Sequence, residues 1–303
     1  MSAGCVSRTH TAGDDDTLMP GSHDFHILID GVERHYVVHV PTGFRGNTSL
    51  PAVIMLHGGG GTSGGTIMET GWTDKADQEG FIAVFPDGLP VRSTIPRSFI
   101  FNPQVWNDGS GRGQKDPGMD EDVRFIGSII NRLIADYGVD DSRVYVAGFS
   151  NGGSMAFRAG AELSDKVAAI GIVSGICYVS PQNLKSPVPM IYFLGTEDPY
   201  NTIEGGFTRM PWGVSEDKPP VNSTVKKWAA LVNATDSPDI LDIKNGIYSV
   251  RYGTSSGVTV EYYLIDGMGH TWPGGKSLLP QTMVGPVSNK ISATDVMWEF
   301  FSK

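Results

Sequence analysis

The chain has 303 residues, 40% of them hydrophobic, which is enough for a sizeable core in one large α/β domain or two small ones. Its formal net charge is −10, and its Lys and Arg residues form no basic block. These features argue against nucleic acid or an anionic membrane surface as the partner. No stretch is long and apolar enough to span a bilayer, and Cys5 and Cys177 offer neither a disulfide framework nor zinc-site spacing.

The first 22 residues are polar and predict a flexible tail, followed by a single domain over residues 23–303. Within the tail, "SAGC" is similar to the end of a bacterial lipoprotein signal, with Cys5 as the lipidated residue. The apolar segment that precedes such a cysteine is not in the sequence, as if the signal had been removed. We therefore expect a secreted, periplasmic or lipid-anchored protein, with an ordinary tail on a cytoplasmic protein as the alternative.

Alternating and apolar runs predict the strands. Residues 24–44 alternate on both sides of Asp30-Gly31, which predicts a β-hairpin. Continuously apolar runs are typical of strands buried on both faces of a parallel sheet, and they occupy residues 50–56, 80–86, 143–148, 166–175 and 188–195. A late strand pair is expected at 247–253 and 258–267.

Helical patterns alternate with these strands. A helix is expected from about Asp120 to Gly138, another from Ser150 onward, and a closing helix over residues 292–302. A further helix over residues 222–234 would take Asn222 or Ser223 as its N-cap. Strands that alternate with helices predict βαβ units, a mostly parallel central sheet and helices on both faces.

Ser150 lies in "GFSNG", a G-x-S-x-G pattern between a predicted buried strand and a predicted helix. A sharp turn there would expose the hydroxyl, and only small residues such as Gly148 and Gly152 avoid clashes around it. The alternative is a serine that only caps the helix.

A serine nucleophile needs a base, and in this type of site the chain order is serine, acid, histidine. Only His270 lies downstream of Ser150, in a glycine-rich loop after a strand. Asp198 is the favoured acid; Glu197 and Asp266 are competitors.

The oxyanion of such a reaction needs two backbone donors. The Asn151 N–H at the start of the helix would be one. The glycine-rich "LHGGGG" would supply the other, from Gly59 or alternatively from Gly60. His57 in the same motif is interpreted as a structural residue that fixes the loop.

These motifs, with "FPDG", "GTEDP", "GMGHTWPGG" and "ISATDVMWEFF", occur in the order found in one esterase family. Over roughly residues 24–302 the chain resembles the polyhydroxybutyrate depolymerase-like and feruloyl esterase group of α/β-hydrolases. The resemblance implies an α/β-hydrolase fold and a serine carboxylesterase that works through an acyl-enzyme without a cofactor or metal. It places the nucleophile on Ser150, the acid on Asp198 and the base on His270.

The family acts on feruloylated or acetylated plant polysaccharides, on aryl esters and on hydroxyalkanoate oligomers. We expect feruloyl or cinnamoyl esters as substrates, with poly- or oligo(3-hydroxybutyrate) as the alternative. An acetylxylan-type esterase and a non-catalytic binding protein are weaker alternatives. Trp106 and Trp272 are candidates to stack on the substrate, with ordinary packing as the alternative. Two long loops, 89–115 and 207–220, are expected to frame the acyl pocket.

Overall fold

The computed structural model describes residues 19–46, 49–111, 121–179, 184–210, 213, 215–234, 238–253 and 257–303. Cys5 and the first 18 residues lie outside the described residues, so the lipid-anchor and secretion hypotheses stay predictions. The hairpin already includes residues 21 and 22, which the sequence places in the tail. The single domain over 23–303 likewise stays a prediction. None of the described helices combines the length and apolar character that crossing a membrane requires.

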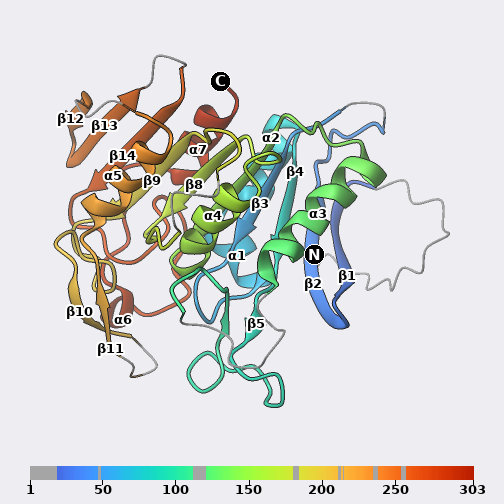
Figure 1. The fold of residues 1–303 in the computed structure, drawn as a ribbon, viewed down its shortest axis with the longest axis horizontal. Helices are drawn as coiled ribbons and strands as arrows, with labels where there is room; N and C mark the ends of the chain where they lie inside the picture. Colours follow the sequence, from blue (N-terminus) through green and yellow to red (C-terminus); the bar gives the residue numbers. More distant parts are fainter. Residues whose placement is uncertain are drawn as a thin grey trace.

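Within the described residues, ten strands form one central sheet, and its six middle strands are parallel (Figure 1). The strands, in sheet order, are β1 (Gly21–Ile29), β2 (Val32–Val40), β4 (Ile82–Pro86), β3 (Ala52–Leu56), β7 (Val144–Phe149), β8 (Ala169–Val173), β9 (Met190–Gly195), β14 (Thr259–Ile265), β13 (Ile247–Gly253) and β12 (Asp239–Lys244). The predicted hairpin and late strand pair form the antiparallel edges. Every strand that the apolar runs predict is therefore confirmed.

Helices cover both faces of the sheet, as the alternation of strands and helices predicts (Figure 1). They are α1 (Ser63–Thr70), α2 (Trp72–Glu79), α3 (Asp122–Tyr137), α4 (Asn151–Glu162), α5 (Val221–Leu231), α6 (Gln281–Val284) and α7 (Ala293–Phe301). Neighbouring residues of β3 point to opposite faces: Ile54 joins the core under α3, α4 and α5, whereas Val53 and Met55 join the core under α2 and α7. Both cores consist of buried apolar side chains, and burial on both faces favours the observed register of the parallel strands.

The predicted start of α5 is wrong. Its N-cap is Pro220, not Asn222 or Ser223, and the Ser223 hydroxyl donates to the Pro220 carbonyl oxygen at 2.6 Å. Ser223 lies inside the first turn, where its hydroxyl binds the carbonyl group of the N-cap residue and does not occupy the N-cap position itself. Helices α1 and α2 were missed because they are short and rich in Gly, Thr and charged residues. Two small hairpins were also missed: β5 (Leu89–Pro90) with β6 (Gln104–Val105), and β10 (Gly206–Arg209) with β11 (Ser215–Lys218).

A buried ion pair joins the N-terminal hairpin to α3. Arg34 Nη2 on β2 donates to Asp122 Oδ1 at 2.7 Å, and both side chains are almost fully inaccessible. The other carboxylate oxygen, Oδ2, accepts the backbone N–H of Asn107 at 2.7 Å. Asp122 therefore anchors both the N-terminal hairpin and the loop before α3. The guanidinium lies over the Phe125 ring at 4.1 Å.

Replacing Asp122 with Ala is expected to lower the free energy of unfolding by about 3–5 kcal/mol, because the Arg34 guanidinium would remain buried without its counter-ion. Urea denaturation measures this. Asp136→Ala is the matched control, since the Arg132–Asp136 pair is partly exposed and its loss should cost under about 1 kcal/mol. Equal costs for the two variants would show that the buried pair does not anchor the hairpin.

Candidate active site

Ser150 lies at the sharp turn between β7 and α4, with φ 55° and ψ −118°. This region of backbone space is sparsely populated for any residue except glycine, and such strain gathers at functional sites. The Ser150 N–H is held by the Val173 carbonyl oxygen at 2.8 Å. No side-chain capping bond is formed by Ser150, so the cap interpretation does not explain the serine.

Both glycines of the motif are required by close backbone contacts. A Cβ on Gly148 would lie 2.2 Å from the Gly152 carbonyl oxygen. A Cβ on Gly152 would lie 2.3 Å from the Leu56 oxygen and 2.4 Å from the His57 oxygen. Helix α4 therefore begins directly against the end of β3, and the steric reason for small residues around Ser150 is confirmed.

Asp198 and His270 meet beyond the carboxyl ends of β9 and β14. His270 Nδ1 is 2.8 Å from Asp198 Oδ2, and the carboxylate is fully buried. The other oxygen, Oδ1, accepts the N–H groups of Tyr200 at 2.8 Å and Asn201 at 2.9 Å. Burial alone would raise the pKa of Asp198, but the charge and hydrogen bond of His270 and these two N–H groups hold it below its usual value. The carboxylate is thus ionised and fixes the imidazole with Nε2 facing away from it.

The two competing acids are not placed to do this. Glu197 is exposed, and its backbone N–H is bound to the Met268 carbonyl oxygen. Asp266 is 75% exposed and lies near Lys290, with Nζ and Oδ2 4.0 Å apart. Of the three carboxylates that the sequence offers, only Asp198 contacts the histidine.

Aromatic rings hold the imidazole on two sides. The Phe149 ring lies 4.8 Å from the His270 ring, and the Tyr200 ring meets it edge-on at 5.0 Å. Ser150 and His270 line the same small cavity of about 50 Å³, together with Gly59. The structure therefore brings the predicted serine, histidine and glycine loop to one place.

The glycine-rich loop is fixed by His57, as the sequence predicts. The Gly88 N–H donates to His57 Nε2 at 2.8 Å, so the ring proton is on Nδ1 and is donated to the Gly58 carbonyl oxygen at 2.7 Å. Burial lowers the pKa of His57 and keeps the ring neutral. The Gly60 N–H is occupied by the Gln104 carbonyl oxygen at 2.7 Å, whereas the Gly59 N–H has no partner among the described residues. Gly59 is thus the better placed of the two candidate donors.

Trp106 packs inside the protein, which is the alternative to stacking on a substrate that the sequence left open. Its side chain is fully buried, and its Nε1–H donates to the His57 carbonyl oxygen at 2.9 Å. Its backbone is clamped by the Asn151 side chain, whose Oδ1 accepts the Trp106 N–H at 2.7 Å and whose Nδ2 donates to Asp108 Oδ2 at 2.9 Å. The Asn151 backbone N–H remains available at the first position of α4.

Trp272 is only 3% exposed, and its Nε1–H donates to Thr294 Oγ1 at 3.0 Å. The indole lines the small cavity beside His270, where Phe99 is a second aromatic wall. Its contact with a ligand can involve only the edge that faces this cavity.

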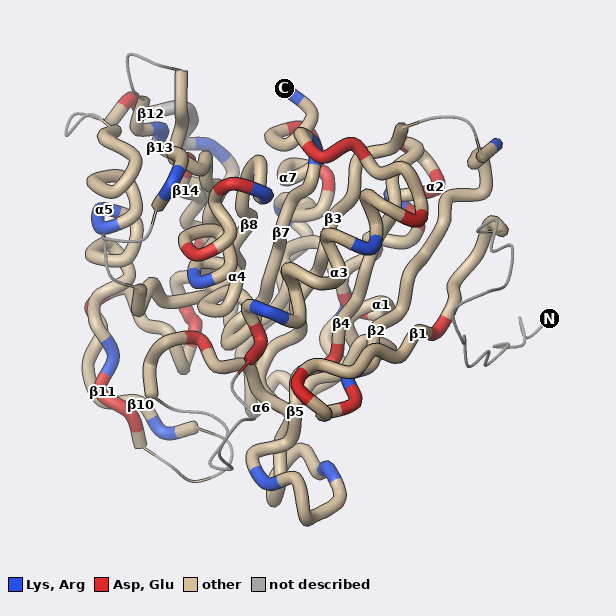
Figure 2. Tube along the Cα trace, turned by 45° about the vertical axis from the view of Figure 1, so that its right-hand side comes forward, with Lys and Arg blue, Asp and Glu red and all other residues tan. Residues whose placement is uncertain are grey.

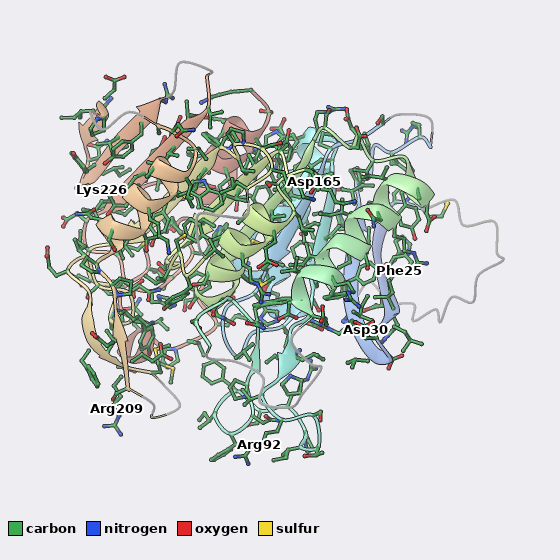
Figure 3. The ribbon with its side chains drawn as sticks, viewed as in Figure 1. Phe25, Asp30, Arg92, Asp165, Arg209 and Lys226 are labelled. Carbon is green, nitrogen blue, oxygen red and sulfur yellow. The ribbon has the colours of Figure 1, made fainter. Side chains whose placement is uncertain are left out.

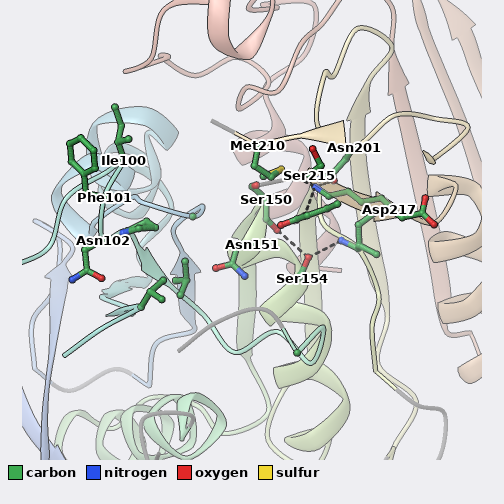
Figure 4. A pocket seen from close by; sticks show the side chains of 18 of the residues that line it. Ile100, Phe101, Asn102, Ser150, Asn151, Ser154, Asn201, Met210, Ser215 and Asp217 are labelled. Atoms are coloured by element: carbon green, nitrogen blue, oxygen red, sulfur yellow. Dashed lines mark hydrogen bonds and ion pairs between the residues drawn. The ribbon is translucent and has the colours of Figure 1, made fainter. Parts of the chain in front are cut away.

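A larger cavity of about 740 Å³ opens over Ser150 and Asn151 (Figure 4). One wall comes from the loop around β5 and β6 and is mostly apolar: Val91, Ile100, Phe101, Pro103 and Val105. The opposite wall is polar and combines Asn201 with hairpin β10–β11: Ser215, Glu216, Asp217 and Lys218. Both predicted long loops therefore line the space above the serine. Arg92 and Arg209 project from the ends of the two walls (Figure 3).

The buried side chain of Asn102 stabilises the conformation of the apolar wall. Its side-chain Oδ1 accepts the Arg92 N–H at 2.9 Å, and its Nδ2 donates to the carbonyl oxygens of Arg92 at 2.9 Å and Ile95 at 2.7 Å. Sequence patterns did not indicate the structural roles of Asn102, Asn201 and Lys218. Asn201 follows Asp198 by three residues, a signal that could have been noticed, whereas no local pattern marks the other two.

A carboxylate network supports the glycine loop from behind. Asp87 accepts the Ser63 N–H at 2.6 Å at the start of α1 and lies 2.8 Å from His35 Nδ1. His35 Nε2 is 2.9 Å from Asp24 Oδ1. The hydrogen bond to Asp87 is the largest cause that raises the pKa of His35 above 6.5, and Asp24 adds to it against the effect of burial. Asp87 therefore links the start of α1 to the N-terminal hairpin.

A strained serine after a buried strand and an Asp–His pair at the same end of a mostly parallel sheet are the marks of an α/β-hydrolase. A family model described as "Putative esterase" matches residues 30–246, so the chain belongs to this esterase family and is a carboxylic ester hydrolase. Its relatives include feruloyl esterases and poly(3-hydroxybutyrate) depolymerases, which confirms the resemblance seen in the sequence.

Among these relatives, "Putative esterase NocK" of Nocardia uniformis subsp. tsuyamanensis is 26% identical over 290 residues, which cover 90% of this chain and 80% of NocK. "Feruloyl esterase B" of Piromyces equi is 27% identical over 80% of this chain and 44% of that protein. The chain thus spans less than half of that feruloyl esterase. The solved structure of the acetyl xylan esterase from Aspergillus awamori shares the fold, with a TM-score of 0.55 at 19% identity over 78% of this chain and 89% of that one.

Gly152→Ala is expected to lower the free energy of unfolding by about 1–3 kcal/mol or more and to reduce esterase activity, because the new methyl group would collide with two rigid carbonyl oxygens. Gly127→Ala in α3 is the matched helical control. Its Cβ would be 3.4 Å from the flexible Leu163 side chain, and Ala favours a helix by about 1 kcal/mol. Chemical denaturation and activity assays measure both. If Gly152→Ala behaves like Gly127→Ala, the close approach does not restrict this position.

His35 is expected to stabilise the fold in a pH-dependent way. Because its folded pKa is raised above 6.5, its contribution is fully present below about pH 6.5 and is lost as pH rises through the raised value. The difference in unfolding free energy between wild type and His35→Gln should therefore shrink between about pH 6 and pH 9. A difference that stays constant or grows over this range would contradict the assignment.

Proposed function

We propose that the protein is a serine carboxylesterase in which Ser150 is the nucleophile, His270 the general base and Asp198 the acid that orients the base. The observation that carries this proposal is the 2.8 Å contact between His270 Nδ1 and a buried, ionised Asp198, beside a strained serine that lines the same cavity. A paired aspartate selects the imidazole tautomer that leaves Nε2 free to accept the serine proton.

The reaction then proceeds in two halves. Ser150 Oγ attacks the ester carbonyl carbon while His270 Nε2 takes its proton; the C–O bond to the alcohol breaks, and the alcohol leaves with that proton. Water, deprotonated by the same nitrogen, attacks the acyl-serine and releases the acid. The oxyanion of each tetrahedral intermediate would be held by the backbone N–H groups of Gly59 and Asn151, each worth about 10²–10³ in rate.

Feruloyl or cinnamoyl-type esters of plant cell-wall material are the proposed substrates. Three facts support them: relatives named feruloyl esterase, aromatic side chains in the small cavity, and the polar wall of the large cavity. That wall offers the carboxylates of Glu216 and Asp217, which only accept hydrogen bonds, and the Ser215 hydroxyl, which both donates and accepts. Sugar hydroxyl groups do both and can satisfy such a wall, whereas a polyester chain presents almost only acceptors.

Hydrolysis of oligo(3-hydroxybutyrate) or a related polyester is the second candidate. Exposed aromatic side chains near the cavity favour it: Phe101 on the apolar wall is 89% exposed, and Phe207, on β10 of the hairpin that contributes the polar wall, is 79% exposed. Relatives named poly(3-hydroxybutyrate) depolymerase support it as well.

Initial rates on methyl ferulate and on a 3-hydroxybutyrate oligomer, measured side by side, test the reaction and the substrate together. Wild type is expected to favour the ferulate. Ser150→Ala should lose about 10⁶-fold on both substrates, and Asp198→Asn about 10⁴-fold, because each removes a member of the triad. A faster rate on the oligomer would identify the polyester, and not the feruloyl ester, as the preferred substrate. Full activity of Ser150→Ala on either substrate would refute the triad.

A further inference from the structure

Lys218, at the end of β11, is a lysine buried in the wall of the large cavity, with 5% of its side chain exposed. Its Nζ donates to the Asn201 side-chain oxygen at 2.9 Å and lies 3.5 Å from Glu216 Oε2. A buried ammonium is costly unless it is paired and hydrogen-bonded, so these contacts restrict where the side chain can sit.

Asn201 accepts the hydrogen bond from Lys218 and donates hydrogen bonds to Ser174 and Asp198. Its side-chain Nδ2 donates to the Ser174 carbonyl oxygen at the end of β8, and its backbone N–H donates to Asp198 Oδ1 at 2.9 Å. The amide orientation is fixed by its partners, because an ammonium can only donate and a carbonyl oxygen can only accept. Asn201 is thus held from three directions, and one of them is the triad carboxylate.

The contacts form a continuous chain from Lys218 through Asn201 and Asp198 to His270. Hairpin β10–β11, which forms the polar wall, is thereby tied to the loop that carries the acid (Figure 4). We propose that Lys218 is a positioning residue for ester hydrolysis: it fixes Asn201, and through it the Asp198 carboxylate that orients His270. This inference rests on the triad proposed above.

The mechanism predicts an effect on turnover, even for a small substrate. Without the ammonium, the Asn201 oxygen loses its donor, and the carboxylate is supported by a less constrained loop. Displacements of about 1 Å in such a support cost about 10²-fold in rate. Lys218→Met, which keeps the length of the side chain but removes the charge, should therefore lower kcat on p-nitrophenyl acetate by about 10²-fold with little change in KM.

A double-mutant cycle with Asn201→Ala tests the route. If Lys218 acts through Asn201, Lys218→Met should cost almost nothing further in the Asn201→Ala background. The resonance of the proton between His270 Nδ1 and Asp198 should also shift in Lys218→Met. Lys227→Met is the matched control, because Lys227 is a partly buried lysine that donates to the Cys177 carbonyl oxygen at 3.1 Å outside this chain of contacts.

Rates are expressed per active site titrated with a fluorophosphonate, so unfolded protein does not count as lost activity. If Lys218→Met does not fold, Asn201→Ala alone must still lower kcat and shift the same resonance. Independent effects in the cycle, or a change in KM alone, would overturn the positioning role. Activity that survives Ser150→Ala would instead overturn the triad, so the two failures are distinguishable.

Discussion

The close approach of helix α4 to the end of β3 is the constraint on which the site depends. The start of α4 lies against the carbonyl groups of Leu56 and His57, at a distance that excludes even a methyl group on Gly152. This contact forces the turn at Ser150 into a strained conformation and aims the N-terminus of the helix at the glycine loop. The proposed nucleophile and the proposed Asn151 oxyanion donor are therefore positioned by one backbone contact, which also places them beside the glycine loop.

Polar side chains hold the remaining parts of the site against that contact. His57 fixes the glycine loop, and Asn151 clamps the segment of Trp106 and Asp108. On the other side of the serine, Asp198 joins the loops after β9 and β14. His57 and Asp198 are buried and Asn151 is half-buried, and each makes its hydrogen bonds to backbone groups or charged partners, which makes the geometry stiff before any substrate arrives.

Much of this arrangement could be predicted from sequence because it is local. Buried parallel strands appear as apolar runs, and the turn at Ser150 needs glycines at fixed positions. Because the base follows the serine in the chain, His270 was the one histidine in the sequence that could take this role. The unpredicted parts depend on long-range contacts: Trp106 is bound by Asn151, which lies 45 positions further along the chain, and Lys218 contacts Asn201, which lies 17 positions before it. The hydrophobic periodicity of the sequence does not indicate such contacts.

The Asn102 side chain ties the apolar wall to itself rather than to the sheet. Residues between Arg92 and Asn102 can therefore be exchanged as a unit, provided that the amide, its backbone partners and the Phe99 ring beside His270 are retained. Such modularity separates the evolution of substrate preference from that of the chemistry. Related enzymes could acquire different esters by rewriting this segment while the strands that carry serine, aspartate and histidine stay unchanged. It also marks the segment as a natural site for grafting loops in engineered esterases.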